Sequence, residues 1–136
     1  MNILHLNLIK KWFDMIRSGQ KPEEYRDITD YWAVRLIDNW KPFSLAAKEC
    51  MLRTMNDTAF EEYELKECIE LDVKNFSHIH FKNGMARNGI AAPCFDIELE
   101  SISVGQGKQK WGAEPGKRYF VFKLGSQLNT LFITET

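Results

Sequence analysis

Charged residues near the N-terminus have types and a spacing that could do chemistry. Lys21, Glu24 and Arg26 fall within Gly19–Asp27, a segment that follows a predicted helix and begins a predicted strand. Because side chains alternate along a strand, Glu24 and Arg26 share one face. A carboxylate and a guanidinium at that spacing can pair, and each can also contact a polar ligand. Lys21, just before the strand, can place its ammonium over the same cleft.

The spacing alone supports two interpretations of these residues equally. One is a ligand-binding cleft, and the other is a solvent-exposed ion pair that contributes little to stability. An enzyme would use Lys21 as a base once burial favoured its neutral form, and Glu24 as acid or base. Turnover separates an enzyme from a binding module, because a binding module leaves its ligand unchanged.

The elements around this segment are expected to alternate between strand and helix. Residues 3–8 alternate apolar and polar, which is typical of a half-buried strand. Helical spacing begins at Lys10 and stops at Ser18-Gly19, a good C-terminal helix signal. After the charged strand, the segment 27–30 offers N-cap candidates for a helix that runs through Ile37.

The middle of the chain is expected to be helical. Residues 44–71 predict two helical pieces separated near Asn56-Asp57-Thr58, and the second piece is acidic. Such a charge run is usually a solvated helix face. The alternative is a surface that contacts another protein, in which case the chain would be a host-interaction module.

The second half of the chain predicts strands, and the whole predicts a small β-barrel or curled sheet with helices at one side. The expected strands lie around 78–81, over 94–104 with a bulge or bend near Ser101, and over 118–124. The length of 136 residues fits one domain, taken as 1–136. The predicted fold class is therefore α+β.

The net charge is close to neutral, at −1, with 27% charged residues. Dedicated non-specific nucleic-acid binders are usually strongly basic, since phosphate neutralisation supplies their affinity. Any nucleic-acid ligand would therefore be recognised locally. One local basic strip is predicted around a glycine-rich loop, at Lys108, Lys110, Lys117 and Arg118, and it could equally be solubilising charge.

The cysteines and the N-terminus favour a cytoplasmic protein. Cys50, Cys68 and Cys94 are widely spaced, which suggests neither a disulfide framework nor a zinc site. The N-terminus lacks the features of a signal peptide, and no stretch is long enough to span a membrane. We expect no cofactor and no membrane partner. The oligomeric state is left open.

Several aromatic residues are candidates for stacking on bases. Tyr31 and Trp32 open the helix after the charged strand, and Trp111 lies in the glycine-rich loop. A tryptophan in such a loop can also serve to hold the loop on the barrel. His78 and His80 alternate on one strand face, and Asp96 or Glu98 could complete a metal site with them. We favour polar sheet-face histidines, and no metal is predicted.

Two sequence motifs, in the order in which they occur, resemble the signature of the ASCH domain family, which belongs to the PUA-like superfamily. The first is Gly19-x-Lys21-x-x-Glu24-x-Arg26. The second runs from Val104-Gly105-x-Gly107 through Trp111-Gly112-Ala113-Glu114-Pro115-Gly116-Lys117 to Tyr119-Phe120, and looks like small ASCH-like proteins of phages and bacteria. The match covers the first and last thirds of the chain. The middle, about 40–75, looks like a helical insertion.

The resemblance implies a PUA-like β-barrel whose cleft is lined by Lys21, Glu24 and Arg26. It also implies recognition of RNA or a modified nucleoside. One enzymatic branch of the superfamily deacetylates an acetylated cytidine with a threonine at the position of Glu24, and another is ribonuclease-like. A carboxylate is a poor replacement for a hydroxyl nucleophile, so the deacetylase activity does not transfer. We expect a binding module for RNA or a modified nucleotide, with a small hydrolase as the alternative.

Overall fold

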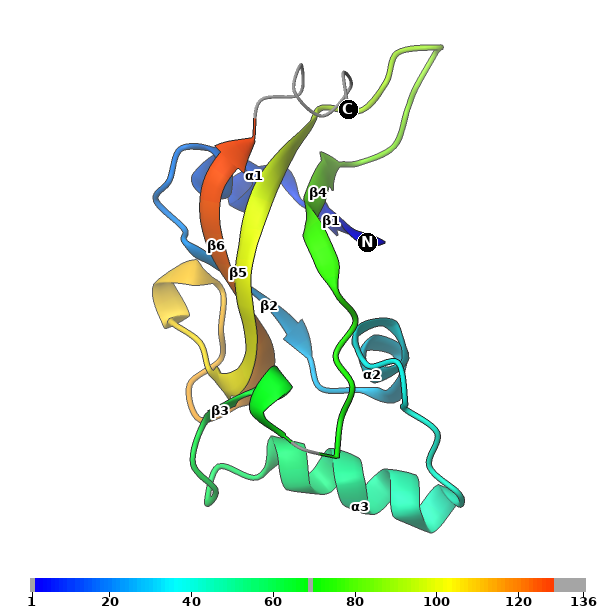
Figure 1. Ribbon diagram of the computed structural model, residues 1–136. Helices are drawn as coiled ribbons and strands as arrows, with labels where there is room; N and C mark the ends of the chain where they lie inside the picture. The colour runs from blue at the N-terminus through cyan, green and yellow to red at the C-terminus, as the bar shows by residue number, and fades with distance from the viewer. Residues whose placement is uncertain (1, 69, 129–136) are drawn as a thin grey trace. The chain divides into compact units, whose positions relative to one another are not determined.

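The computed structural model describes residues 2–68 and 70–128 (Figure 1). The chain divides into two compact units, which we call unit 1 and unit 2. Unit 1 holds the described parts of Met1–Pro22, Asn75–Glu100 and Leu124–Thr136, and unit 2 holds those of Glu23–Lys74 and Ser101–Lys123. Each unit contains strands and helix, which confirms the α+β class. The PUA-like barrel stays a prediction.

Unit 1 is a small sheet with one helix packed on it. Its elements are β1 (Asn2–Leu8), α1 (Lys10–Arg17), β4 (Phe76–Asn83), the first part of β5 (Cys94–Gln106) and the last part of β6 (Arg118–Leu128). β1 runs parallel to β4, and β4 runs antiparallel to β5. Figure 1 shows α1 (blue) beside β1, and α1 also contacts β4.

The core of unit 1 follows from simple periodicity. Leu4 and Leu6 alternate inward from β1 and meet their β4 partners Ile79 and Phe81. Phe13 of α1 packs edge-on against Phe95, with ring centroids 5.0 Å apart. Burying side chains of this size contributes about 1.5–3 kcal/mol each. The predicted strand at 3–8 and the predicted helix from Lys10 to Ser18 are confirmed.

Unit 2 carries the charged strand. Its elements are β2 (Glu23–Asp27), α2 (Asp30–Leu36), α3 (Leu45–Asn56), β3 (Tyr63–Glu64), the 3₁₀ turns η1 (Leu65–Glu67) and η2 (Gln109–Trp111), and the remaining parts of β5 and β6. β2 runs antiparallel to β6, and β3 runs antiparallel to β5. Thr29 caps α2 and Ser44 caps α3, each accepting a main-chain N–H with its hydroxyl.

The prediction of a second helical piece between 58 and 71 is wrong. Helix α3 ends at Asn56, and the chain continues into the short strand β3 and the 3₁₀ turn η1. Tyr63 pairs with Val104 of β5, and Leu65 is completely buried. Helix propensity of the glutamates yields here to strand pairing with a distant segment. Ile69, also inside the predicted helix, lies outside the described residues.

The glycine-rich loop between β5 and β6 is a structural element of unit 2. The Tyr25 hydroxyl accepts a hydrogen bond from the main-chain N–H of Lys108 at 3.0 Å, and the Tyr119 hydroxyl accepts one from that of Glu114 at 2.9 Å. Ala113 packs with both rings in a small buried cluster. The second sequence motif therefore encodes a loop that is anchored by two tyrosines.

None of the helices in the described ranges has both the length and the apolar composition needed to cross a membrane.

Candidate ligand-binding site

The two faces of β2 have different surroundings. On one face, Glu24 and Arg26 stand opposite Phe122 and Phe120 of β6. On the other face, Tyr25 stands opposite Val121 and joins the cluster under the glycine-rich loop. The alternation expected from the sequence therefore places the two charged side chains on one face, with completely buried phenylalanines beside them.

Glu24 and Arg26 form a mostly buried ion pair. An Arg26 Nη2–H donates to Oε2 of Glu24 at 2.9 Å, and the side chains of Glu24 and Arg26 are only 7% and 20% exposed, respectively. The alternative of a solvent-exposed ion pair is therefore wrong. A charge-assisted hydrogen bond in such surroundings is stronger than one in water, and it holds the guanidinium in one orientation.

Trp32 completes a cluster with this pair. The guanidinium carbon of Arg26 lies 5.1 Å from the centroid of the Trp32 ring. The Thr29 cap places Trp32 in the first turn of α2, directly after the charged strand. We call Glu24, Arg26 and Trp32 the arginine cluster. It combines a fixed cation, a carboxylate acceptor and an aromatic face, the groups that proteins use to hold bases.

The other aromatic candidates lie elsewhere in unit 2. Tyr31 is 57% exposed, meets Trp32 edge-on, and has the guanidinium of Arg35 at 3.3 Å from its ring centroid. Trp111 belongs to the glycine-rich loop, which is anchored on the face of β2 that carries Tyr25. The Lys110 ammonium lies 4.7 Å from the centroid of the Trp111 ring. Trp111 is thus part of a loop that packs away from the face carrying Arg26.

Lys21 belongs to unit 1 and is almost completely buried, with 1% of its surface exposed. Its main-chain N–H donates to the carbonyl of Met15 at 3.0 Å, which fixes the turn after α1. Its ammonium lies 5.3 Å from the centroid of the Trp12 ring. A lysine is almost never buried to this degree unless its ammonium is paired.

Arg118 is a buried arginine, although its place in the sequence predicted a surface strip. It is only 2% exposed, so its assignment to that strip is wrong. Its Nε and Nη1 atoms have no hydrogen-bond partner in residues 2–68 and 70–128. The alternation along β6 could have predicted this burial. Arg118 is two and four residues before Phe120 and Phe122, so all three side chains lie on the same face of the strand. The position of Arg118 beside the exposed loop hid that pattern.

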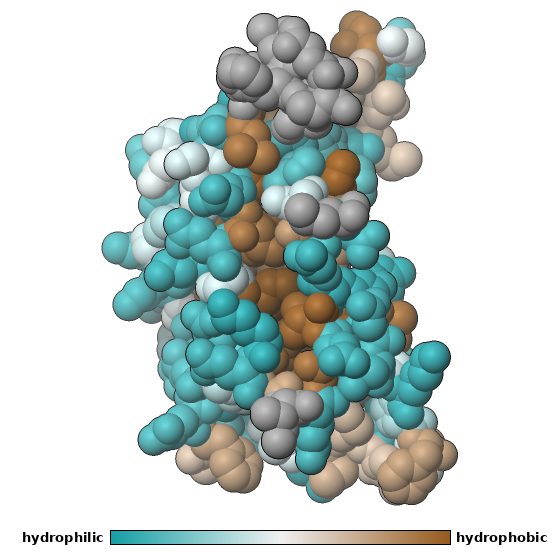
Figure 2. Space-filling view, in the orientation of Figure 1, coloured by the Kyte–Doolittle hydropathy of each residue, from teal (hydrophilic) through white to brown (hydrophobic). Residues whose placement is uncertain are grey.

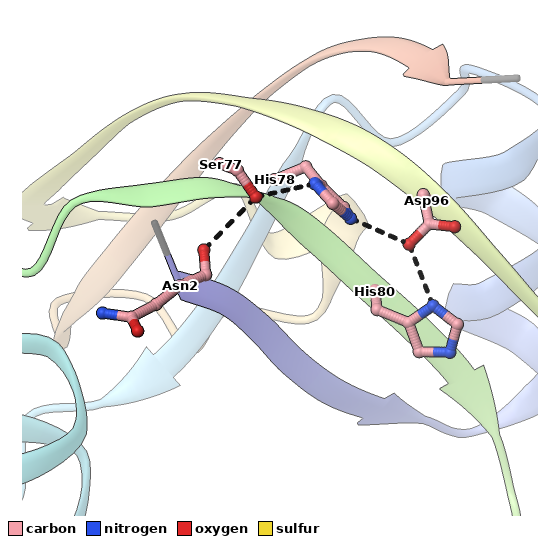
Figure 3. Close-up of polar contacts among 5 residues, drawn as sticks. All are labelled: Asn2, Ser77, His78, His80 and Asp96. Carbon is pink, nitrogen blue, oxygen red and sulfur yellow. Dashed lines mark hydrogen bonds and ion pairs between the residues drawn. The ribbon is translucent and has the colours of Figure 1, made fainter. Parts of the chain in front are cut away.

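Histidines and an aspartate form a second polar cluster, in unit 1 (Figure 3). Nδ1 of His80 lies 2.9 Å from Oδ1 of Asp96, and Nε2 of His78 lies 3.2 Å from the same oxygen without hydrogen-bond alignment. The Ser77 hydroxyl lies 2.9 Å from Nδ1 of His78 and reaches the carbonyl of Asn2. We call His78, His80 and Asp96 the histidine cluster.

The histidine cluster does not form a metal site in the described residues, where no group of three or more histidine, cysteine, aspartate or glutamate side chains has a suitable arrangement. The pairing of β4 with β5 explains why these three side chains lie together. His80 stands directly opposite Asp96 in the β4–β5 pairing, so the carboxylate lies between the two imidazoles. The cluster satisfies a carboxylate that is nearly buried, and it fixes the β4–β5 register.

The loop between β4 and β5 carries apolar side chains at its tip, seen as brown and tan patches at the upper right of Figure 2. Met85 and Ile90 are strongly exposed there. The loop, including its residues Arg87 and Pro93, lines a hollow of about 440 Å³. This hollow holds no cluster of titratable groups among its described lining residues.

Tyr25 gives unit 2 a predicted dependence on alkaline pH. Burial, with the Glu23 carboxylate as hydrogen-bond acceptor, raises the pKa of Tyr25 well above its ordinary value. A raised pKa means that the folded state holds its proton more tightly, so stability is complete below about pH 10 and falls as the pH rises further. In urea unfolding between pH 9 and pH 11, Tyr25→Phe is expected to be less stable at pH 9 but to lose less stability with pH than the wild type. An unchanged slope would contradict this.

No protein-family model matches this chain, and comparison with curated proteins and with solved structures found no significant match either.

Proposed function

We propose that this protein is a binding module for RNA or a modified nucleotide, and that the arginine cluster of unit 2 holds the base or phosphate. The observation that carries the proposal is the position of Arg26, which is held by Glu24 at 2.9 Å and lies over Trp32 at 5.1 Å. A guanidinium fixed in this way presents its N–H groups in one set of directions. It can then recognise a phosphate or the acceptor edge of a base.

In this proposal each residue has a distinct role. Arg26 anchors the ligand, and Glu24 orients Arg26 or accepts a hydrogen bond from a base amine. Trp32 supports the guanidinium, while the more exposed ring of Tyr31 is available for stacking. The PUA-like fold and a cytoplasmic location belong to the same proposal. The role of Lys21 as a second positive contact remains a prediction from the motif.

A small hydrolase acting on a modified nucleoside or an RNA phosphodiester is the second candidate. The observation that favours it is the near-complete burial of Lys21. Amines that act as bases are generally removed from water, since burial disfavours the ammonium. Lys21→Ala would then abolish product formation, whereas a binding module forms no product with either protein.

The test of the binding proposal compares Arg26→Ala with Arg53→Ala. Both changes remove an arginine from unit 2, but Arg53 is exposed in the last turn of α3 and lies outside the arginine cluster. With a mixed pool of RNA oligonucleotides and modified nucleosides, we expect Arg26→Ala to weaken retention about tenfold or more, the loss of one charge-assisted contact of about 1–3 kcal/mol. Arg53→Ala should retain the ligand like the wild type.

The same samples are followed by circular dichroism and by mass spectrometry of the pool. Arg26→Ala should keep the wild-type circular dichroism spectrum, so that weaker retention reports binding and not unfolding. Equal retention by wild type and Arg26→Ala would rule out Arg26 as the anchor. Product that appears with wild type and vanishes with Lys21→Ala would replace the binding module by the hydrolase.

A further inference from the structure

The buried side chain of Arg118 has N–H groups without a hydrogen-bond acceptor among the described residues. Its side chain is almost entirely removed from water, yet Nε and Nη1 donate to no acceptor in residues 2–68 and 70–128. Arginine stays charged under all ordinary conditions. A buried charge without a hydrogen-bonded counter-charge is among the most expensive features that a folded protein can carry. Such a feature is expected where a ligand supplies the missing acceptor.

The described residues around Arg118 do not neutralise its charge. Tyr63 interacts with it electrostatically, but burial raises the pKa of Tyr63, so its phenol is uncharged at neutral pH. Glu24, which lies on the same face of the β2–β6 pair, is already bonded to Arg26. Phe120 beside it is completely buried and apolar. The positive charge of Arg118 is therefore left for an acceptor from outside the described chain.

Unit 2 thus carries a second guanidinium on the face that holds the arginine cluster. Arg26 stands opposite Phe120 in the β2–β6 pairing, and Arg118 is two residues before Phe120 on the same strand. Side chains two residues apart on a strand point to the same side. The two guanidinium groups consequently flank one phenylalanine on one face of the sheet.

We propose that Arg118 is the anion subsite of unit 2 and that it binds the phosphate of a nucleotide ligand. Phosphate oxygens match the several N–H donors of a guanidinium and carry the charge that a buried arginine lacks. The identification of the phosphate as part of a nucleotide rests on the proposed function. The binding of an anion at Arg118 does not depend on it.

The proposal predicts an unusual pairing of effects for Arg118→Met. Methionine fills a similar volume without a charge, so the ligand-free variant should be more stable than wild type, by about 3 °C or more in melting temperature. The wild type should be stabilised by millimolar inorganic phosphate relative to sodium chloride of equal ionic strength. Arg118→Met should lose that phosphate-dependent stabilisation. Arg35→Met, at an exposed arginine, should change neither quantity.

The experiment measures melting temperatures of the four proteins, wild type, Arg118→Met, Arg118→Lys and Arg35→Met, with phosphate, nucleoside monophosphates and uncharged nucleosides. Arg118→Lys keeps the charge and should stay less stable than Arg118→Met. An Arg118→Met protein that is less stable than wild type, or that fails to fold, would show that Arg118 is structural and would overturn the proposal. Equal stabilisation of wild type and Arg118→Met by phosphate would show that the anion binds elsewhere. Stabilisation by uncharged nucleosides alone would assign Arg118 to a base edge and would also overturn it.

The outcome is separable from the proposed function. If phosphate stabilises wild type through Arg118 while RNA and nucleotides are not retained, the anion subsite stands and the nucleic-acid function fails. If RNA is retained through Arg26 and phosphate has no effect that depends on Arg118, the function stands and the subsite fails.

Discussion

Asp96→Ala is expected to lower the free energy of unfolding by about 1–3 kcal/mol, the cost of leaving a buried hydrogen-bonding group without its partner. The Asp96 side chain is only 9% exposed, and its Oδ1 lies 3.2 Å from Nε2 of His78 and 2.9 Å from Nδ1 of His80. Without it, Nδ1 of His80 loses its hydrogen-bond partner, Nε2 of His78 loses the neighbouring carboxylate, and a cavity remains between β4 and β5. Urea unfolding at pH 7, followed by tryptophan fluorescence, measures the change.

A matched control for this change lies on the same strand. Glu100 has the same parity as Asp96 but is exposed, so Glu100→Ala should change the free energy of unfolding by no more than about 0.5 kcal/mol. Asp96→Asn should fall between the two, because the amide keeps one acceptor oxygen for His80. If Asp96→Ala and Glu100→Ala were equally mild, the histidine cluster would not contribute to stability.

Gly107→Ala is expected to destabilise the protein by about 1–3 kcal/mol, the usual cost of overpacking a filled site. A β-carbon at this position would lie 2.6 Å from the Tyr25 ring and 2.6 Å from the β-carbon of Ala113. Neither neighbour can give way easily, since the Tyr25 ring is fixed by its hydroxyl bonds to Lys108 and Glu23. The change would therefore lift the loop from the tyrosines that anchor it. Chemical unfolding measures the loss.

Gly116→Ala separates the steric effect from ordinary loss of a glycine. Gly116 lies in the same loop with open space around its α-carbon, but its φ of 75° is strained for alanine. We expect about 1 kcal/mol of destabilisation there from backbone strain alone. The alkaline slope that depends on Tyr25 should also weaken in Gly107→Ala and stay unchanged in Gly116→Ala. A smaller loss for Gly107→Ala than for Gly116→Ala would contradict the packing argument.

Several features of the structure were already determined by local sequence. The alternation of Leu4 and Leu6 was enough to identify β1, and Ser18-Gly19 was enough to end α1. The parity of Glu24 and Arg26 placed both on one face of β2 without knowledge of the partner strand. These inferences succeed because strand alternation and helix termination depend on residues within a few positions of each other.

The tertiary structure decided the rest. Tyr63 lies in a strand because Val104 pairs with it, although the acidic segment around it resembles a helix in isolation. Asp96 lies between two imidazoles because the β4–β5 register places it opposite His80. Arg118 adjoins exposed loop residues in sequence, yet its strand turns it onto a buried face. In each case the deciding contact joins segments far apart in the chain, and local periodicity carries no information about which segments will pair.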